Sequence, residues 1–178
     1  DGTAHEVAAG LAGCPNAAMT CIPAGTGNDL LRNFGPDMAR FHDAQALWDG
    51  DVFPLDMIEC NGRLCLTIAC SGIDAQVAEG VHRFSRSPLL NGRGSYLCSA
   101  AAELLAHGLR HRWSVSLDDE TVEEDLALVS MCNGRYYGGG SMPVPEARMD
   151  DGVLHTILVR TVSRATFVRL FPAYSARA

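Results

Sequence analysis

The stretch that decides the fold is residues 22–29, which read I-P-A-G-T-G-N-D. An apolar run, residues 19–22, ends at Pro23, and the apolar pair Leu30-Leu31 follows the loop. An apolar run rich in strand formers, a glycine-rich loop and a second apolar segment predict strand, loop and helix in that order. In an open α/β sheet, ligands gather at the carboxyl ends of strands, so this loop is a candidate binding site.

A helix is expected before that strand. Residues 4–12 combine helix formers with apolar residues at helical spacing, and Thr3 with Glu6 three places on has the pattern of a capping box. We therefore expect the helix to begin at Thr3. Helix, strand, glycine loop and helix in succession predict an α/β part over residues 1–50.

The composition changes near residue 50, and the remaining chain, residues 51–178, is rich in strand patterns. Asn61-Gly62 joins two strand-like runs, 52–60 and 64–70, and predicts a β-hairpin. Further strands are expected at 113–117, 126–132 and 153–159, and helices at 73–84, 95–109 and from Ser163 through Leu170. The second part is therefore predicted to be mostly antiparallel β-structure with helical insertions.

The composition is that of an average globular protein. The chain has 178 residues, 47% hydrophobic residues and a net charge of −7, which argues against a nucleic-acid partner because phosphate contacts need clustered cations. No apolar stretch approaches the roughly 18 residues of a membrane-spanning helix. All 14 cationic residues are Arg, which excludes a Schiff-base or P-loop lysine within this stretch.

The seven cysteines are scattered singly, with no C-x-x-C pair. The odd count and the spacing argue against a disulfide scaffold or a zinc ribbon. We expect most of these residues to be small buried hydrophobes of a protein in the reducing cytoplasm.

Two segments of the first part have the residue types of a phosphate site. Asp1-Gly2-Thr3 opens a helix, where free N–H groups and the helix dipole favour phosphate, although an ordinary capped helix would look the same. The loop 23–29 offers backbone donors, side-chain donors and a carboxylate for Mg²⁺. The alternative for this loop is a glycine turn with Asn28 or Asp29 as the helix N-cap.

Two segments of the second part also suit a ligand. Residues 133–140 read N-G-R-Y-Y-G-G-G. The three successive glycines allow a ligand to approach the backbone closely, or allow positive φ angles, although a loop without a binding role is an alternative. Residues 148–152 read R-M-D-D-G, in which carboxylates and backbone carbonyls suit a hard cation, although Asp-Gly is also a good turn.

The order of these motifs resembles the diacylglycerol kinase catalytic-domain family, and within it the bacterial soluble lipid kinases. The resemblance covers nearly the whole chain. It rests on D-G-T at residues 1–3, the loop 22–29, C-S-G-I-D-A-Q-V at 70–77, the glycine-rich segment 133–140, and M-D-D-G-V-L at 149–154.

The resemblance implies an ATP-binding α/β domain, whose C-terminal part is residues 1–50, followed by a sandwich-like β-rich domain at 51–178, with the active site in the cleft between them. It implies a magnesium and phosphate motif at Asp1, Gly2 and Thr3, in which Asp1 is the catalytic carboxylate. It further implies nucleotide-binding residues at Gly25, Thr26, Gly27, Asn28 and Asp29. A structural magnesium site would consist of Asp151 with the backbone carbonyls of Met149 and Val153.

The implied activity is a lipid kinase that uses ATP and Mg²⁺ to phosphorylate a lipid hydroxyl such as that of diacylglycerol. The protein is then expected to be cytoplasmic, to associate peripherally with a membrane, to bind no nucleic acid and to form a homodimer if it oligomerises. The family's Asp-Gly-Glu motif, which carries its proposed general base, and its earlier strands do not occur in this sequence, so we expect this stretch alone to be catalytically incomplete. Alternatives are a sphingosine or ceramide kinase, an NAD kinase, and a regulatory nucleotide- or lipid-binding module without catalysis.

Overall fold

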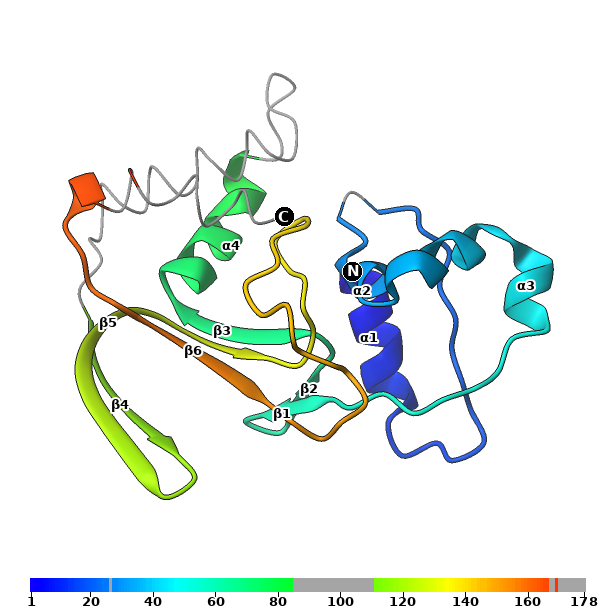
Figure 1. Ribbon diagram of the computed structural model, residues 1–178, viewed down its shortest axis with the longest axis horizontal. Helices are drawn as coiled ribbons and strands as arrows, with labels where there is room; N and C mark the ends of the chain where they lie inside the picture. Colours follow the sequence, from blue (N-terminus) through cyan, green and yellow to red (C-terminus); the bar gives the residue numbers. More distant parts are fainter. Residues whose placement is uncertain (26, 85–110, 167–168, 170–178) are drawn as a thin grey trace. The chain divides into compact units, whose positions relative to one another are not determined.

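The computed structural model describes residues 1–25, 27–84, 111–166 and 169, which form two compact units (Figure 1). Unit 1 contains Asp1–Ala69 and Met131–His155, and unit 2 contains the described residues of Cys70–Ser130 and Thr156–Ala173. Unit 1 is thus assembled from segments far apart in the sequence. The expected helix at 95–109 lies outside the described residues.

Unit 1 consists of short helices and one hairpin. The helices are α1 (Gly2–Leu11), α2 (Asp29–Arg32), the 3-10 helix η1 (Gly35–His42) and α3 (Ala44–Trp48). The hairpin pairs β1 (Ile58–Cys60) with β2 (Arg63–Cys65), which also contacts α1. A buried cluster of Ala8, Leu30, Leu66 and Met149 joins α1, α2, the segment that follows the hairpin, and the segment that follows strand β5 (Glu120–Cys132).

The turn of this hairpin confirms the Asn61-Gly62 prediction. Both residues have positive φ angles, 52° and 75°, as a tight two-residue hairpin turn requires. The paired strands are shorter than the predicted runs 52–60 and 64–70, because only three residues on each side have a partner and the chain then enters a second sheet at Ile68.

Two predictions for the first part are wrong. Helix α1 has Asp1 rather than Thr3 as its N-cap, and no side chain caps it, because the Asp1 carboxylate accepts a hydrogen bond from Leu30 instead. Residues 19–22 form no strand. A strand needs a neighbour for its backbone N–H and C=O groups, and no described residue pairs with this run.

Unit 2 is dominated by an antiparallel sheet, as the sequence predicts. Its sheet contains β3 (Ile68–Gly72), β4 (His111–Leu117), β5 (Glu120–Cys132) and β6 (His155–Arg160), in the order β3-β5-β4 with β6 also paired to β5. Strands β4 and β5 form a long antiparallel hairpin (Figure 1). Its turn is at Asp118, with a φ of 50°.

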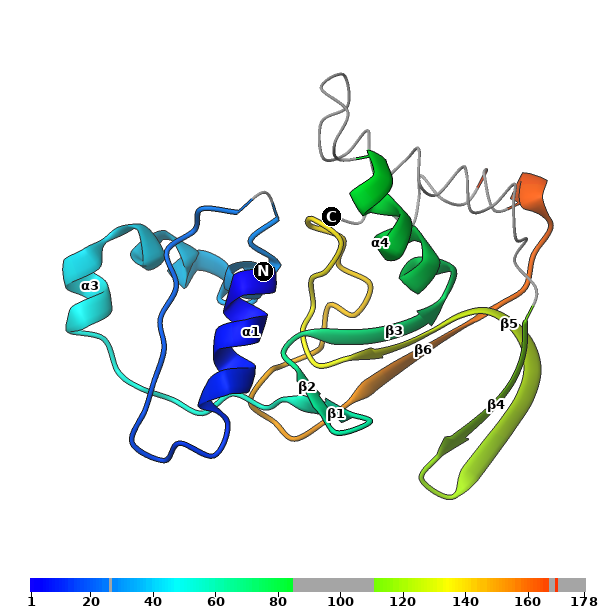
Figure 2. The same ribbon diagram turned by 180° about the vertical axis from the view of Figure 1, so that it is seen from behind.

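Helix α4 (Ile73–Phe84) covers this sheet, and its bounds match the predicted 73–84 (Figure 2). Ile73 and Val77 of the helix pack against Ala127 and Leu128 of β5. Gly72, with a φ of +84°, connects β3 to the helix, and a Cβ at this position would collide with the carbonyl oxygen of Ala127. The close packing of strand on strand here requires glycine.

The predicted cap of the last helix is present. The Ser163 hydroxyl accepts a hydrogen bond from the Thr166 N–H at 3.1 Å, and residues 164–166 are helical. Residues 167–168 and 170, to which this helix was predicted to extend, lie outside the described residues.

The cysteine prediction is wrong for most of the six thiols that the structure describes. Only Cys132 is buried, while Cys14 and Cys60 are exposed and the other three are partly exposed. The hairpin strands that carry Cys60 and Cys65 belong to a two-stranded sheet, which does not bury both of its faces. None of these six cysteines forms a disulfide. Over the same described ranges, no helix has the length and apolar character needed to traverse a bilayer.

Candidate functional site

The carboxylates of Asp1 and Asp29, called here the aspartate pair, converge on the glycine loop of unit 1. Asp1 Oδ1 accepts a hydrogen bond from the Leu30 N–H at 3.0 Å, and Asp29 Oδ2 accepts one from the Gly139 N–H at 2.8 Å. A Cβ on Gly27 would lie 2.9 Å from Asp1 Oδ2 and 3.3 Å from Asp29 Oδ2. Two carboxylates therefore face one small space that only glycine leaves open.

Asn28 shapes the loop in front of this space. It adopts the left-handed conformation, with a φ of 52°, which Asn tolerates better than most residues. Its Oδ1 accepts from the Gly25 N–H at 3.0 Å and its Nδ2 donates to the Gly25 carbonyl at 2.9 Å. Asn28 occupies the N-cap position of α2, but its side chain makes no capping hydrogen bond. The side chain closes the loop on itself instead.

Asp29 is a buried and incompletely paired carboxylate. Its residue is only 6% exposed, and its Oδ1 has no hydrogen-bond partner within the described residues. The nearest cation is Arg32, whose Nε lies 3.7 Å from Oδ1, beyond hydrogen-bond distance. Burying a charge without full pairing is costly, so the Asp29 Oδ1 atom is a candidate partner for a water molecule, a cation or a ligand.

The residues Gly138–Gly140, called here the triple-glycine tip, present the N–H that holds Asp29. All three have positive φ angles, between 66° and 115°. Tyr137 and Ser141 close the tip by exchanging two backbone hydrogen bonds of 3.0 Å. Side chains disfavour these φ angles, so the tip depends on glycine and brings bare backbone to the site.

Asn33 ties helix α2 to the segment that carries the tip. Its Nδ2 donates to the Asp29 carbonyl at 2.9 Å, and its Oδ1 accepts from the Arg135 N–H at 2.7 Å. A Cβ on Gly134 would lie 3.1 Å from the Asn33 amide, so the two segments approach closely. One amide thus joins α2 to the start of the segment that carries the tip.

Asn133 anchors the start of the same segment. It is buried, and its Nδ2 donates to the carbonyls of Asp56 and Leu66 at 2.7 and 2.8 Å. Its own N–H donates to the Thr67 carbonyl at 2.9 Å. The first residue of the N-G-R-Y-Y-G-G-G motif is therefore a structural anchor.

The proposed metal turn, residues 149–153, lies elsewhere in unit 1. Asp151 Oδ1 accepts from the Val153 N–H at 3.0 Å. Asp56, which lies outside the turn in sequence, makes two hydrogen bonds to it. Its N–H donates to the Met149 carbonyl, and its Oδ2 accepts from the Gly152 N–H, both at 2.7 Å. Each of the two carboxylates keeps a second oxygen for a cation.

The remaining predicted residues are less constrained. Gly2 and Thr3 lie in the exposed first turn of α1, and a Cβ on Gly2 would meet nothing within 4 Å. Thr26 lies outside the described residues. No hydrogen bond between described residues joins the metal turn to the aspartate pair. The described residues also include no group of three or more acidic, His or Cys side chains around one point, so any cation needs further oxygens from a ligand or water.

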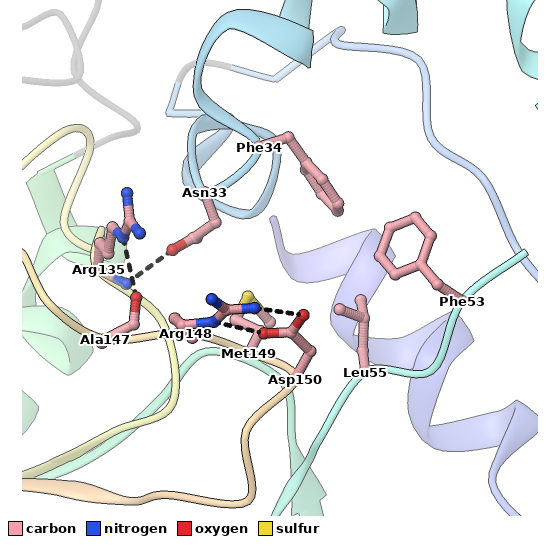
Figure 3. Close-up of a pocket in the computed structure, with 9 residues that line it drawn as sticks. All are labelled: Asn33, Phe34, Phe53, Leu55, Arg135, Ala147, Arg148, Met149 and Asp150. Atoms are coloured by element: carbon pink, nitrogen blue, oxygen red, sulfur yellow. Dashed lines mark hydrogen bonds and ion pairs between the residues drawn. The ribbon is translucent and has the colours of Figure 1, made fainter. Parts of the chain in front are cut away.

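A cavity of about 200 Å³ lies beside Asn33, within unit 1 (Figure 3). Figure 3 shows Asn33, Arg135 and Ala147 on one side and Phe34, Phe53 and Leu55 on the other. The Arg148–Asp150 ion pair, with an N–O distance of 3.0 Å, lies between them. The hydrogen bond from Arg148 lowers the pKa of the Asp150 carboxyl. The lining residues are Asn33, Phe34, Phe53, Leu55, Arg135, Ala147, Arg148, Met149 and Asp150. Of the predicted site residues, only Met149 contributes to this cavity.

Three contributors to these arrangements were missed by sequence reasoning: Arg32, Asn33 and Asp56. Asp56 offers a signal, because it is one of only two carboxylates within the otherwise apolar strand-like run 52–60. Asn33 lies one helical turn after Asp29, but nothing in the sequence indicates its partner in the distant segment.

Two families match the sequence. The family described as "YegS C-terminal NAD kinase beta sandwich-like domain" matches residues 67–176, and the one described as "Diacylglycerol kinase catalytic domain" matches residues 1–60. The chain belongs to the family of the YegS C-terminal NAD kinase beta sandwich-like domain, and its first 60 residues match the diacylglycerol kinase catalytic domain. The resemblance inferred from the motifs is confirmed.

The similar proteins agree with this membership. A Pseudomonas aeruginosa protein named "Probable lipid kinase YegS-like" is 33% identical over 163 residues, which cover 90% of this chain and 52% of that protein. A Mycobacterium tuberculosis protein named "Diacylglycerol kinase" is 34% identical, over 97% of this chain and 56% of that protein. This chain therefore spans about half the length of these curated relatives.

The fold is shared with a solved structure. The crystal structure of a diacylglycerol kinase from Bacillus anthracis superposes with a TM-score of 0.55 at 24% identity, over 86% of this chain and 47% of that one. The predicted class, an α/β part followed by an antiparallel β-rich domain with helical insertions, is confirmed by this likeness and by the sandwich-like family match.

Proposed function

We propose that the protein containing this chain is an ATP-dependent lipid kinase, which transfers the γ-phosphoryl group of ATP to a lipid hydroxyl such as that of diacylglycerol. The observation that carries the proposal is the convergence of Asp1 and Asp29 on the space at Gly27. Family membership supports the reaction class. Because its acceptor would be a lipid, the enzyme would act in the cytoplasm and bind the membrane surface peripherally.

The residues at this space fit a magnesium–nucleotide complex. Mg²⁺ in phosphoryl-transfer sites is commonly held by one or two carboxylates together with phosphate oxygens and water. Asp1 Oδ2 and Asp29 Oδ2, the two oxygens that face the space at Gly27, would hold it, since a carboxylate oxygen that accepts one N–H keeps a second lone pair. When bound, the ion would neutralise charge on the transferring phosphate.

The protein's own part in the reaction is positioning. Phosphoryl transfer requires mainly orientation and charge stabilisation, which rigid backbone donors and carboxylates supply. The Gly139 N–H fixes the rotamer of Asp29, and the bonds between Asn28 and Gly25 fix the loop beneath it. The bare backbone at Gly25 and Gly27 and the start of α1 are the surfaces that phosphate can approach.

We place a second, structural cation at the metal turn. Asp151, with the carbonyls of Met149 and Val153, would hold it, as the family resemblance implies. The free oxygen of Asp56 adds a second carboxylate to this set. The ion would tie the turn to the segment that carries Asp56, because both carboxylates already hold N–H groups of this turn.

The test is a phosphotransfer assay of the intact natural protein that contains this chain. Labelled ATP and Mg²⁺ are offered with diacylglycerol, monoacylglycerol, sphingosine or ceramide in mixed micelles, and with NAD in a separate reaction. We expect label in a lipid product, most strongly with diacylglycerol, and at least about tenfold less label with Asp29→Asn. Measurable ATP binding without transfer to any acceptor would instead support a binding module. Label in NAD alone would support an NAD kinase.

A further inference from the structure

Arg32 has a fixed position at the candidate site that none of the motifs explains. Its Nε donates to the Gly27 carbonyl at 3.0 Å and lies 3.7 Å from Asp29 Oδ1. Its guanidinium carbon lies 3.6 Å from the point that a Cβ on Gly140 would occupy. The arginine therefore bridges the glycine loop and the triple-glycine tip on the side where the aspartate pair lies.

Only part of its hydrogen-bonding capacity is used by these contacts. A guanidinium carries five N–H donors, and Nε accounts for one. Within the described ranges, neither Nη atom has a hydrogen-bond partner, and the side chain is 41% exposed. Four charged donors are thus held near Gly27 and Gly140 and remain open to solvent or a ligand.

The charge balance of the site gives this cation a chemical role. Two carboxylates face the space at Gly27, and the chain contains no lysine that could supply a compensating charge. Arg is the side chain whose planar donors match the oxygens of a phosphate. A nucleotide tail placed at the aspartate pair would have its phosphate oxygens within the neighbourhood of these open donors.

We infer that Arg32 is a phosphate-binding residue, which uses its Nη donors to hold the outer phosphates of the nucleotide while Nε keeps the side chain fixed on Gly27. This inference rests on the proposed function. The inference assigns Arg32 the role of distinguishing a nucleoside triphosphate from nucleoside diphosphates and monophosphates. The alternative is a purely structural arginine that only holds the loop.

The two roles differ in how binding depends on the number of phosphates. Binding constants of ATP, ADP and AMP, with Mg²⁺, are measured by calorimetry for the intact protein, for Arg32→Gln and for Arg32→Lys. Arg112→Gln serves as the matched control, because Arg112 is an exposed arginine of unit 2 whose Nη2 lies 3.8 Å from the exposed carboxylate of Glu123. Melting temperatures of all four proteins report any structural effect.

We expect Arg32→Gln to weaken ATP binding about tenfold or more, ADP binding less, and AMP binding less than about twofold. Arg32→Lys should recover part of the loss for ATP, because it restores the charge without the planar fork. Arg112→Gln should bind all three nucleotides as the wild type does.

Equal losses for the three nucleotides, or no loss for any of them, would overturn the role of Arg32 while leaving the proposed kinase intact. A wild-type protein that binds none of the nucleotides would overturn the proposed function, and the inference with it.

Discussion

The two units are stabilised in different ways. In unit 1, single side chains bond to backbone across long stretches of sequence: Asp29 to Gly139, 110 residues apart, and Asn133 to Asp56, 77 residues apart. In unit 2, the described sheet is held by a continuous ladder of backbone hydrogen bonds between β4 and β5 and by close apolar packing beneath α4. The Ser116–Thr121 and Glu124–Arg160 side-chain pairs on this sheet are exposed. The geometry of unit 1 therefore depends on individual polar groups, and the geometry of unit 2 depends on backbone pairing and the close packing of apolar side chains.

This difference predicts which substitutions matter in each unit. A polar change should act strongly in unit 1 and weakly on the surface of unit 2. A change of volume should act strongly where strands approach in unit 2. The following substitutions test this contrast.

Gly72→Ala should produce the largest loss of stability, about 2–4 kcal/mol, because Ala must adopt a φ of +84° and its Cβ would collide with the Ala127 carbonyl. The free energy of unfolding is measured by urea denaturation. Gly62→Ala is the control, because Gly62 has a φ of +75° but a Cβ there would meet no atom within 4 Å. Its loss of about 1 kcal/mol measures the free-energy cost of the positive φ angle alone. Equal effects of the two substitutions would show that close packing at Gly72 is unimportant.

Asn133→Ala should lower the free energy of unfolding by about 2 kcal/mol, because two carbonyls inside unit 1 lose their donor. The exposed Asn16→Ala is the matched control and should have no measurable effect. The same urea titration serves for both variants. A loss below about 0.5 kcal/mol for Asn133→Ala would mean that water replaces the amide and that the anchor is dispensable.

Asp29→Asn should reduce kinase activity of the intact protein at least about tenfold, because it removes a positioned charge beside the phosphates. The amide oxygen can still accept the Gly139 N–H, so the melting temperature should change little. Initial rates are compared with those of Asp37→Asn, an exposed acidic residue of η1, which should keep full activity. An unchanged rate for Asp29→Asn would reduce Asp29 to a structural role.

Asp151→Asn should remove the Mg²⁺-dependent part of the thermal stability, about 1 kcal/mol or roughly 2–4 °C, because binding free energy is linked to folding. Asn preserves the turn, since its side-chain oxygen can accept the Val153 N–H. Melting curves are recorded with Mg²⁺ and with chelator. Asp150→Asn, whose native carboxylate pairs with Arg148, is the control and should retain the Mg²⁺ effect. Identical wild-type curves in the two media would rule out a structural cation.

Glu124→Gln should have the smallest effect, because Glu124 and Arg160 form an exposed ion pair in unit 2. The hydrogen bond from Arg160 lowers the pKa of Glu124 below its ordinary value of 4.5. A lowered folded-state pKa contributes stability above pH 4.5 that disappears as the pH falls through the lowered value. The small difference in melting temperature from wild type should therefore exist at pH 7 and vanish in acid. A difference that grows in acid would contradict this assignment.

Local chemistry made part of this structure predictable. Asn61-Gly62 specifies its turn, and the helix at 73–84 carries its own apolar periodicity. The loop 22–29 could be identified as a candidate site because its glycines and polar residues are contiguous. Each of these signals is contained within a dozen neighbouring residues.

The errors and omissions concern partners far along the chain. The run 19–22 has the composition of a strand but has no strand beside it among the described residues. The capping box failed because Asp1 is the N-cap of α1 and its carboxylate bonds to Leu30, 29 residues away. Nothing local to Asn33 indicates that its amide accepts the N–H of Arg135, 102 residues later.

The bond between Asp29 and Gly139 also constrains the order of events during synthesis. At typical translation rates, about 5–20 residues per second, Gly139 leaves the ribosome on the order of ten seconds after Asp29. During that interval the Asp29 carboxylate lacks the donor that later holds it, and Asn33 lacks Arg135. Closing so long a loop also costs entropy that only the completed contacts offset. The candidate site around Asp29 should therefore mature late, after the strands of the intervening segment have been made.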